Sequence, residues 1–554
     1  MEPRERGFPG VVGSDQIQRL IERVSSEIQQ FTENQMIQIR RLTRIGTALS
    51  AERDIQRLLE LIVEEARKFT GADGGTLYTM SDDEQELHFA IVQTESLGIR
   101  MGGTGGPIAW NPVRLQNADG TPNHGNVSAH VALTGGIVNI PDVYDAEGFD
   151  FQGTRQFDAR TGYRSRSMLV VPMKNHENDI IGVLQLLNAR SEESGEVIPF
   201  SYECQEMTES LASQAAVALS NNRLIHDLEN LMESFIRSIA TAIDEKSPYT
   251  GGHVRRVAEL TMEIARHIND AAEGPYAAVR FSEDEMKELR IAAWLHDVGK
   301  VTTPEYVVDK ATKLETIFDR IDLLRLRFEL CAAQNRLRQE REAGESPSAE
   351  GAGTVNSLAE EYLFLTEANR GDERMTDERL SRVRAIAART WEFDGQTQPL
   401  LSPEEVEKLS VRQGTLTAEE RGVIQNHATV TYKMLSQLPF PKKLRRVPEY
   451  AAAHHETLNG KGYPRGIDER ELSLQSRILA LADIFEALTA KDRPYKKGKT
   501  LSEAMHILSM MAKDRHLDPD LFDLFTREEI HLDYARRELS PQQIDVSGPE
   551  LKIS

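Results

Sequence analysis

Histidine and aspartate residues in the second half of the chain form the pattern most able to do chemistry. Two adjacent histidines, His454 and His455, end a stretch that reads as a helix, PEYAAAHHE, and lead into a loop with two glycines. Neighbouring residues on a helix point about 100° apart, so both rings can reach one cation or two close ones. An isolated pair of histidines is more often an ordinary surface feature, so the other ligand-type residues decide the interpretation.

A second pair, His296 and Asp297, follows the apolar stretch IAAWL and precedes Gly299, a residue type at which helices commonly end. The pair supplies one nitrogen and one carboxylate, and a carboxylate can bridge two metal ions. Asp483 lies inside the apolar run ILALADIF. An unpaired carboxylate is costly there, so we expect Asp483 to be bonded, with a metal as a good candidate.

With His253 and His427, the set comprises five histidines and two aspartates on segments that read as helical. Nitrogen and carboxylate donors in this mixture suit a pair of borderline divalent transition metals. The residue pattern alone supports no more than a dinuclear phosphohydrolase.

In their order along the chain, these residues resemble the HD-GYP branch of the HD-domain phosphohydrolases. The resemblance covers about residues 230–515 and rests on His253, His296-Asp297, Lys300, His427, HHE at 454–456, GKGYP at 460–464, Asp483 and RPYK at 493–496. It implies an all-helical domain, a site with two or three iron or manganese ions, and a cyclic dinucleotide substrate, chiefly cyclic di-GMP.

The resemblance also implies a role for each residue. One metal ion would be held by His253, His296, Asp297 and Asp483, and the other by Asp297, His427, His454 and His455. Asp297 and Lys300 would be catalytic, and the predicted substrate contacts are Lys300, Gly460, Gly462, Tyr463, Pro464, Arg493 and Lys496. Tyr463 could stack on a base or pack beneath the loop, and the basic groups have solvated surface charge as their alternative. Tyr249 stands where some family members carry a glutamate for a third metal, which favours two metals.

The predicted function is a phosphodiesterase of bacterial signal transduction that hydrolyses cyclic di-GMP to linear pGpG, to GMP, or to both. The nucleophile would be a hydroxide activated by two metals, and the N-terminal domain would regulate the reaction. Two alternatives stay open, namely a hydrolase of another cyclic dinucleotide and a non-catalytic receptor for cyclic di-GMP. The intact ligand set weighs against the receptor.

Composition sets the outer bounds. The 554 residues, 39% apolar and 28% charged, fit a soluble protein of two to four domains. A net charge of −22 argues against a nucleic-acid polymer as partner. Two cysteines, Cys204 and Cys331, form no disulfide framework and predict a reducing compartment. No apolar run reaches the length of a membrane span, so we expect a cytoplasmic protein without a membrane partner.

Residues 1–50 read as a tail and a helix, and residues 51–205 as an α+β sensory domain with strands near 72–78, 167–172 and 180–188. The run from Ile140-Pro141-Asp142 to Asn188 resembles the GAF family, specifically its cyclic-nucleotide-binding type. That type has a lysine after the asparagine, but here Ala189 follows Asn188, and Cys204-Gln205 replaces its acidic pair. The lysine–aspartate ion pair cannot form, so we expect a different small-molecule ligand, or none, more than a cyclic mononucleotide.

Residues 206–240 read as a linker helix with apolar residues three and four apart, interrupted by one polar residue, Asn222. Such a repeat predicts a coiled coil, and we expect a parallel homodimer through this helix. The alternative is an ordinary amphipathic helix packed within one domain.

Residues 241–554 form the predicted HD-GYP domain, in which a capping box at Ser282–Glu285 begins the helix that leads to His296. Residues 311–412 separate Lys300 from His427 and read as a helical hairpin, with a heptad stripe that includes Leu314 and Ile317. This insertion could cap the site or extend the dimer.

Overall fold

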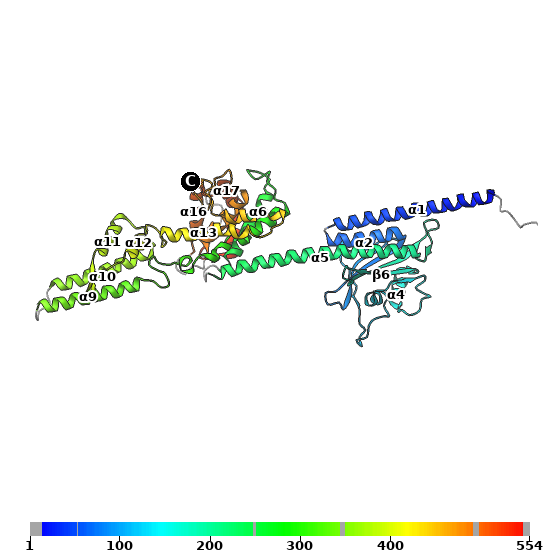
Figure 1. Ribbon diagram of the computed structural model, residues 1–554, viewed down its shortest axis with the longest axis horizontal. Coiled ribbons are helices and arrows are strands. Elements are labelled where there is room, and N and C mark those ends of the chain that lie inside the picture. The colour runs from blue at the N-terminus through cyan, green and yellow to red at the C-terminus, as the bar shows by residue number, and fades with distance from the viewer. Residues whose placement is uncertain (1–13, 53, 247–250, 344–348, 491–497, 547–554) are drawn as a thin grey trace, which may run out of the picture. The chain divides into compact units, whose positions relative to one another are not determined.

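The computed structural model describes residues 14–52, 54–246, 251–343, 349–490 and 498–546. It divides into two compact units, residues 1–230 and 231–554 (Figure 1). The boundary falls inside helix α5 (Tyr202–Asp244).

The first unit is built on one antiparallel sheet with the strand order β3-β2-β1-β7-β6-β5, in which β4 pairs with β2 and β8 with β7. The predicted central strand, residues 180–188, is confirmed as β7. The elements are α1 (Ser14–Ala51), α2 (Ile55–Thr70), β1 (Ala72–Met80), β2 (Glu86–Thr94), β3 (Ile99–Gly102), η1 (Gly103–Gly105), β4 (Val113–Arg114), α3 (Val127–Thr134), β5 (Val138–Ile140), α4 (Gln152–Thr161), β6 (Met168–Lys174), β7 (Ile180–Arg190) and β8 (Val197–Ile198).

Helices cover one face of this sheet and a smaller group of elements covers the other. Leu58 and Ile62 of α2 and Leu211 of α5 pack against Leu184 of β7, and the two helices lie along the same face in Figure 1. On the opposite face, Val131 of α3 belongs to a second cluster that also contains residues of β5, β6 and β7. The arrangement is the expected α+β fold.

Helix α5 corrects the prediction of one continuous coiled-coil seam through residues 206–240. Leu211 and Ala215 are buried in the core of the first unit, and Ala218 packs against it. Met232 and Ile239 pack against a cluster in the second unit. Only the middle of the stripe is open, where Ile225, Leu228 and Phe235 are between 62% and 69% exposed. A repeat of three and four residues identifies an apolar face but not what covers it, so both ends follow the amphipathic-helix alternative.

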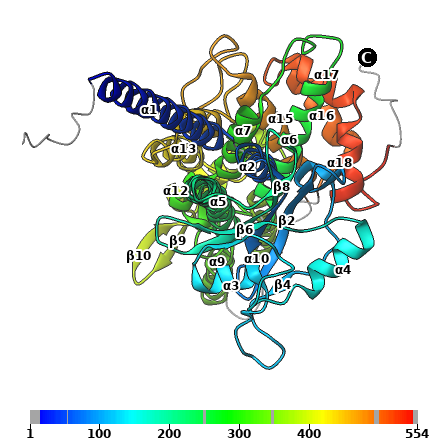
Figure 2. The same ribbon diagram turned by 90° about the vertical axis from the view of Figure 1, so that its right-hand side faces the viewer.

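In its described residues, the second unit is helical apart from one β-hairpin. Outside the insertion its elements are α6 (His253–Asp270), α7 (Glu283–Leu295), η2 (Val298–Thr302), α8 (Glu305–Val308), α13 (Ala418–Leu435), η3 (Lys442–Leu444), α14 (Val447–Ala452), α15 (Leu474–Thr489), α16 (Leu501–Lys513), α17 (Pro519–Arg527) and α18 (Ile530–Glu538). Its largest core joins α6, α7 and α15 to α16, α17 and α18, which lie together in Figure 2.

The insertion contains the expected helical hairpin, α9 (Ile321–Ala343) with α10 (Ala349–Arg370), followed by α11 (Asp377–Ala387), the strands β9 (Thr390–Phe393) and β10 (Gln396–Pro399), and α12 (Pro403–Leu409). The β-hairpin is absent from the sequence prediction. Its turn is Asp394-Gly395, with φ angles of 49° and 71°, and an Asp-Gly pair between two short extended runs is the signal that could have revealed it. The predicted heptad stripe is also too long, because Ile317 precedes α9 and is 95% exposed.

Lys313 is an unusual buried cation at the base of the insertion. Its side chain is 1% exposed, and its Nζ donates to the backbone carbonyls of Leu409 at 3.2 Å and Val411 at 2.8 Å. Burial, helped by the charge of Arg379, lowers the pKa of Lys313 to about 8. Folding therefore disfavours the protonated form of this side chain.

We predict that the stability difference between the parent and Lys313→Met depends on pH. Below a pH of about 8, Lys313 is protonated in both the native and the unfolded parent. The native state then bears the full cost of a buried charge. As pH rises towards about 10.4, the ordinary value for lysine, the native state releases its proton first, so the parent gains stability relative to the variant. Melting temperatures at about pH 7 and about pH 10 measure this, and a constant difference would contradict it. The exposed Lys433, changed to Met, is the control.

Candidate metal centre

The fold brings all seven predicted ligands together in the second unit. His253 is the first residue of α6, His296 follows α7, Asp297 precedes η2, His427 lies in α13, His454 and His455 follow α14, and Asp483 lies in α15. Six of them are buried and His455 is half-buried. Residues from five separate segments therefore meet in one enclosed place.

The ligand atoms form two groups. The nitrogen and oxygen atoms of His253, His296 and Asp297 lie within 4.8 Å of one another, and so do those of His427, His454 and His455. The resemblance assigns the first three residues to one metal ion and Asp297 with the last three to the other, and this assignment stays a prediction.

Two aspartates complete these groups. Asp483 Oδ1 lies 3.4 Å from His253 Nε2 and 3.8 Å from His296 Nε2, so it belongs with the first group. Asp297 Oδ2 lies 3.3 Å from His296 Nε2, whereas its Oδ1 lies 3.4 Å from His427 Nε2. The carboxylate of Asp297 therefore stands between the groups with one oxygen towards each.

Three of the histidines are oriented by their own helices. The Nδ1 atoms of His296, His427 and His454 lie 2.6–2.8 Å from carbonyl oxygens three residues earlier, at Ala293, Ile424 and Ala451. A ring that donates from Nδ1 to a carbonyl presents the lone pair of Nε2. The Nε2 atoms of these three rings and Asp297 Oδ1 are among the described buried atoms that have no hydrogen-bond partner. Buried polar atoms are rarely left unpaired, so this set of donors fits divalent metal ions.

Electrostatics in the second group favours neutral rings. Burial, reinforced by the nearby His455 and His296, lowers the pKa of His454 well below its ordinary value. Burial is also the main cause that lowers the pKa of His455 to about 4. Both rings are therefore neutral near pH 7, which is the form that binds metals.

Carboxylates dominate the first group. Burial alone would raise the pKa of Asp297, but Lys300 and His296 outweigh it and hold the pKa well below the ordinary value. For His296, burial would lower the pKa, yet Asp297 and Asp483 raise it to about 9. A divalent cation between these groups would take the place of the proton that the carboxylates attract.

Gly299 allows the turn after Asp297 to approach α13 closely. A Cβ atom at this position would lie 2.0 Å from the carbonyl oxygen of His427. Thr431, one turn further along α13, accepts from the Gly299 amide at 3.0 Å and donates to the carbonyl of His296 at 3.0 Å. These contacts set the distance between the two ligand-bearing segments.

The GKGYP loop folds back onto the turn that carries the histidine pair. A Cβ on Gly462 would lie 2.5 Å from Glu456 Cα, so only glycine fits. Tyr463 donates its amide to the carbonyl of His455 at 3.2 Å, and its ring centroid lies 4.7 Å from that of His455. The tyrosine ring thus packs on a candidate ligand.

Both ends of this loop are held. The buried carboxylate of Glu456 accepts from the amides of Arg465 at 2.7 Å and Ile467 at 3.1 Å. Gly460 has a φ of 70°, which favours glycine, and Pro464 is half-buried beside Tyr463. These contacts hold the loop next to the histidine pair.

Among the predicted basic groups, Lys300 lies beside the candidate metal ligands. Its Nζ is 2.6 Å from Asp297 Oδ2, and its side chain is 30% exposed. Arg493 and Lys496 lie outside the described residues, and so does Tyr249.

Sequence reasoning missed the acid that supports His253. Glu486 is 0% exposed, and its Oε2 contacts His253 Nδ1. Its other oxygen accepts from Arg256 Nε at 2.8 Å. Glu486 lies one turn beyond Asp483 in the same apolar helix, and a second acid at that spacing is the signal that could have identified it.

Family models match most of the chain in three segments. A GAF domain model matches residues 54–219, and two HD domain models match residues 250–378 and 399–521. The chain combines a GAF domain with HD-domain sequence. The resemblances drawn from the motifs are confirmed at this level, and the HD matches span the seven candidate ligands.

Curated relatives with the HD domain are named as phosphodiesterases of cyclic dinucleotides. A cyclic di-GMP phosphodiesterase of Thermotoga maritima is 35% identical over 133 residues, which is 24% of this chain and 35% of the relative. The 3'3'-cGAMP-specific phosphodiesterase 3 of Vibrio cholerae is 41% identical over 293 residues, 52% of this chain and 38% of the relative. The 3'3'-cGAMP-specific phosphodiesterase 1 of Vibrio cholerae is 39% identical over 121 residues, which is 22% of this chain and 27% of the relative. The chain thus spans well under half the length of each of these relatives.

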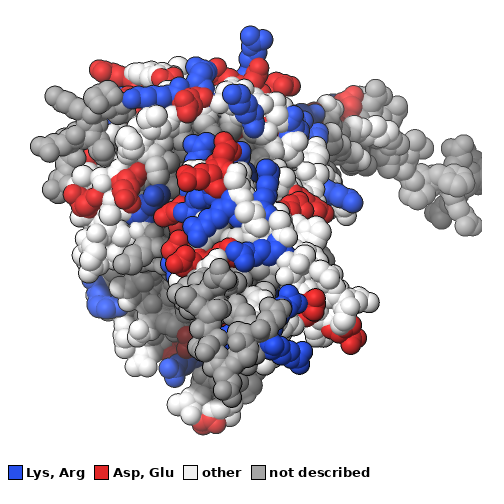
Figure 3. Space-filling model, turned by 90° about the vertical axis from the view of Figure 1, so that its left-hand side faces the viewer, with Lys and Arg blue, Asp and Glu red and all other residues white. Residues whose placement is uncertain are grey.

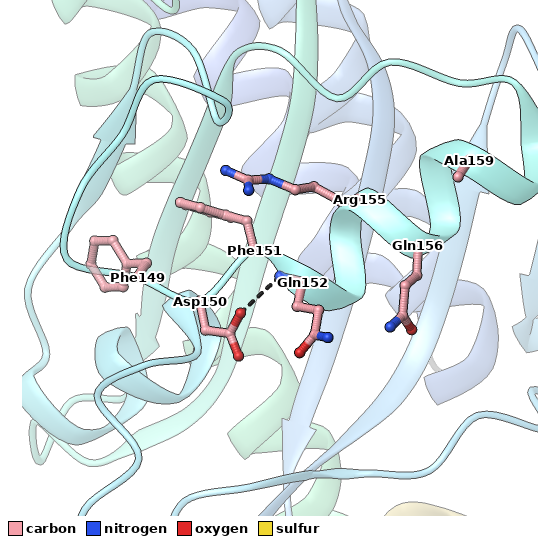
Figure 4. Close-up of a pocket in the computed structure, with 7 residues that line it drawn as sticks. All are labelled: Phe149, Asp150, Phe151, Gln152, Arg155, Gln156 and Ala159. Atoms are coloured by element: carbon pink, nitrogen blue, oxygen red, sulfur yellow. Dashed lines mark hydrogen bonds between the residues drawn. The ribbon is translucent and has the colours of Figure 1, made fainter.

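The sequence departure at Asn188-Ala189 in the GAF domain lies near the end of β7. Asn188 is buried and bonds the backbone of Arg166 and Arg164 at 2.7 and 2.8 Å, so it ties β7 to the segment before β6. An open pocket of about 400 Å³ lies at the start of α4, where Phe149 and Phe151 flank Asp150, which bonds the amide of Gln152 (Figure 4). The ligand of this domain stays a prediction.

On the face drawn in Figure 3, Lys and Arg side chains are interspersed with Asp and Glu side chains instead of forming one broad basic area. Among the helices of the described residues, none combines the length and the apolar character needed to cross a bilayer.

We predict that Gly299→Ala damages the centre, whereas Gly422→Ala does not. The new methyl group at 299 would overlap the carbonyl of His427 and must push α13 away, so the variant should bind less metal and melt at a lower temperature. Gly422 lies in α13, and no atom lies within 4 Å of the point where its Cβ would stand, so alanine there should stabilise the helix by about 1 kcal/mol. Equal metal content in the two variants would refute the close-approach argument.

Proposed function

We propose that the chain is a metal-dependent phosphodiesterase that hydrolyses a cyclic dinucleotide, with cyclic di-GMP as the first candidate substrate. One observation carries the proposal, namely the two groups of buried, inward-facing ligand atoms that share the carboxylate of Asp297. We assign two divalent ions to the seven ligands, and iron or manganese suits their mixture of nitrogen and carboxylate donors.

Two such ions would supply a water with a lowered pKa and positive charge for the phosphoryl oxygens. The chain's own residues do the rest. The neutral rings of His454 and His455 bind without cancelling that charge, and the carboxylate of Asp297 fixes the spacing of the two groups. Lys300 is partly exposed beside Asp297, so its ammonium can bind a phosphate oxygen at the mouth of the site. Tyr463 covers His455 and offers a ring face to a base.

The substrate could instead be 3'3'-cGAMP. The relative that aligns over 293 residues carries that specificity in its name, whereas the cyclic di-GMP phosphodiesterase of Thermotoga maritima aligns over 133 residues. Parallel incubation of the manganese- or iron-loaded protein with both dinucleotides distinguishes the two. Chromatography of the products then decides between linear pGpG and GMP. The non-catalytic receptor has less support, because the seven candidate ligands are all present in the sequence and lie close together.

The proposed route for regulation by the GAF domain is the end of α5 and the two residues that follow it. Asp244 accepts from the amide of Val254, next to His253, at 3.3 Å. Lys246 donates to the carbonyls of Lys300, Val301 and Thr303 at 2.6–3.0 Å. Asp244 and Lys246 therefore contact the residues that follow His253 and Asp297, and we propose that displacement of this end of α5 alters the site.

A homodimer through α5 is the proposed assembly. Leu224, Leu228, Leu231 and Phe235 are 58–69% exposed and follow one another at intervals of four, three and four residues. Such spacing is typical of a coiled-coil seam, which a second copy of the helix would cover.

We predict different defects for two changes in the proposed centre. Asp297→Ala removes the shared carboxylate, so it should empty at least one metal position and abolish turnover. Lys300→Ala keeps the ligands and removes one charge beside a phosphate, so metal content should survive while turnover falls by about one to three orders of magnitude. Elemental analysis and product chromatography measure the two effects.

The exposed Lys433, changed to Ala, is the control for lost charge and should keep the parent rate. Turnover at the parent rate in both site variants would show that the centre lies elsewhere. A metal-loaded parent that binds cyclic di-GMP without hydrolysing it would favour the receptor.

We predict that Leu228→Glu converts the dimer into a monomer, because it places a charge in the centre of the apolar stripe. His226 is exposed and lies about 160° around the helix from Leu228, so His226→Glu adds the same charge away from the stripe and should leave the dimer intact. Light scattering measures both masses, and a monomeric parent would disprove the proposed assembly.

A further inference from the structure

His253 obtains a partner for its Nδ1 in a different way from the other oriented histidines. His296, His427 and His454 each follow a helical turn whose carbonyl three residues earlier accepts from the ring. His253 is the first residue of α6, so no preceding turn of its own helix can supply that carbonyl. Its Nδ1 contacts the carboxylate of Glu486 instead.

Glu486 divides its two oxygens between two tasks. Oε2 contacts His253, and Oε1 accepts from Arg256 at 2.7 Å from Nη2 and 2.8 Å from Nε. The carboxylate is fully buried, and Arg256 balances its charge. Each oxygen thus has a separate function that can be removed by itself.

The same contacts connect two helices through residues at matching intervals. His253 and Arg256 are three residues apart on α6, and Asp483 and Glu486 are three residues apart on α15. His253 Nε2 lies 3.4 Å from Asp483 Oδ1, while its Nδ1 contacts Glu486. The two edges of the imidazole ring therefore face two acids of one helix, which determines both the position and the tilt of the ring.

We infer that Glu486 is the positioning residue of His253 and selectively supports the metal position formed by His253, His296, Asp297 and Asp483. The inference rests on the proposed function. A hydrogen bond from Nδ1–H to a carboxylate makes Nε2 a stronger donor than a bond to a carbonyl does, and loss of such a partner lowers metal affinity about 10–100-fold. In the group of His427, His454 and His455, the first two rings are oriented by backbone carbonyls and His455 packs against Tyr463. Glu486 takes no part in these contacts, so we expect this group not to depend on it.

The test is Glu486→Gln, which keeps the shape and removes the charge. Metal-free protein is titrated with Mn²⁺ or Co²⁺ under equilibrium dialysis, and Co²⁺ absorption reports on the ligand environment. We expect one of the two bound ions to lose affinity by about 10–100-fold while the other keeps the parent affinity. Glu486→Asp retains the carboxylate and should recover part of the loss.

Two further variants separate positioning from ordinary stability. Glu405→Gln removes a carboxylate that is also buried and paired with an arginine, Arg327 at 2.7 Å, but lies in the insertion, and it should leave both affinities unchanged. Arg256→Met removes the contacts of Arg256 with Glu486 Oε1, so it should lower the melting temperature while both ions stay bound. If Glu486→Gln fails to fold, the metal content of Arg256→Met and Glu486→Asp decides.

The possible results are distinct. Unchanged affinities in Glu486→Gln, equal weakening of both ions, or a loss in Arg256→Met as large as that in Glu486→Gln would each overturn the inference while the proposed function stands. A parent that binds no transition metal would overturn the proposed function itself, and the inference with it.

Discussion

The burial of unsatisfied polar atoms is the constraint on which the second unit depends. Nε2 atoms of three histidines and one oxygen of Asp297 are enclosed without hydrogen-bond partners in the described structure. Such atoms destabilise a fold unless something binds them. The surrounding residues respond to that constraint, because each ring is held by a second contact that keeps its free nitrogen pointed inward.

Helix termini do much of the positioning. A capping box at Ser282 begins α7, and His296, which caps the end of this helix, is followed directly by Asp297. Gly299 then lets the following turn rest against α13, so that His427 lies opposite Asp297. Because Gly299 approaches the backbone carbonyl of His427, this contact tolerates little displacement of either segment.

One helix illustrates how the same pattern serves different surroundings. The apolar face of α5 packs on the sheet of the GAF domain near Leu211, is exposed around Leu228, and packs on the HD region near Ile239. The amphipathic repeat continues along the whole helix, but the residues that cover it differ from one part of the helix to the next. The middle of this face is the part that the proposed homodimer would cover.

The sequence by itself predicted the seven candidate ligands that the fold brings together, because their order along the chain matches a specific family pattern. It also determined the helix caps and the α+β character of the first unit, since both follow from local residue types and periodicity. Only the tertiary structure decided which oxygen of Asp297 faces which group, that Glu486 supports His253, that Tyr463 rests on His455, and which parts of α5 are covered. The reason is that these facts concern pairs of residues far apart in the chain, and local periodicity indicates that a face is apolar or that an acid needs a partner without identifying the partner.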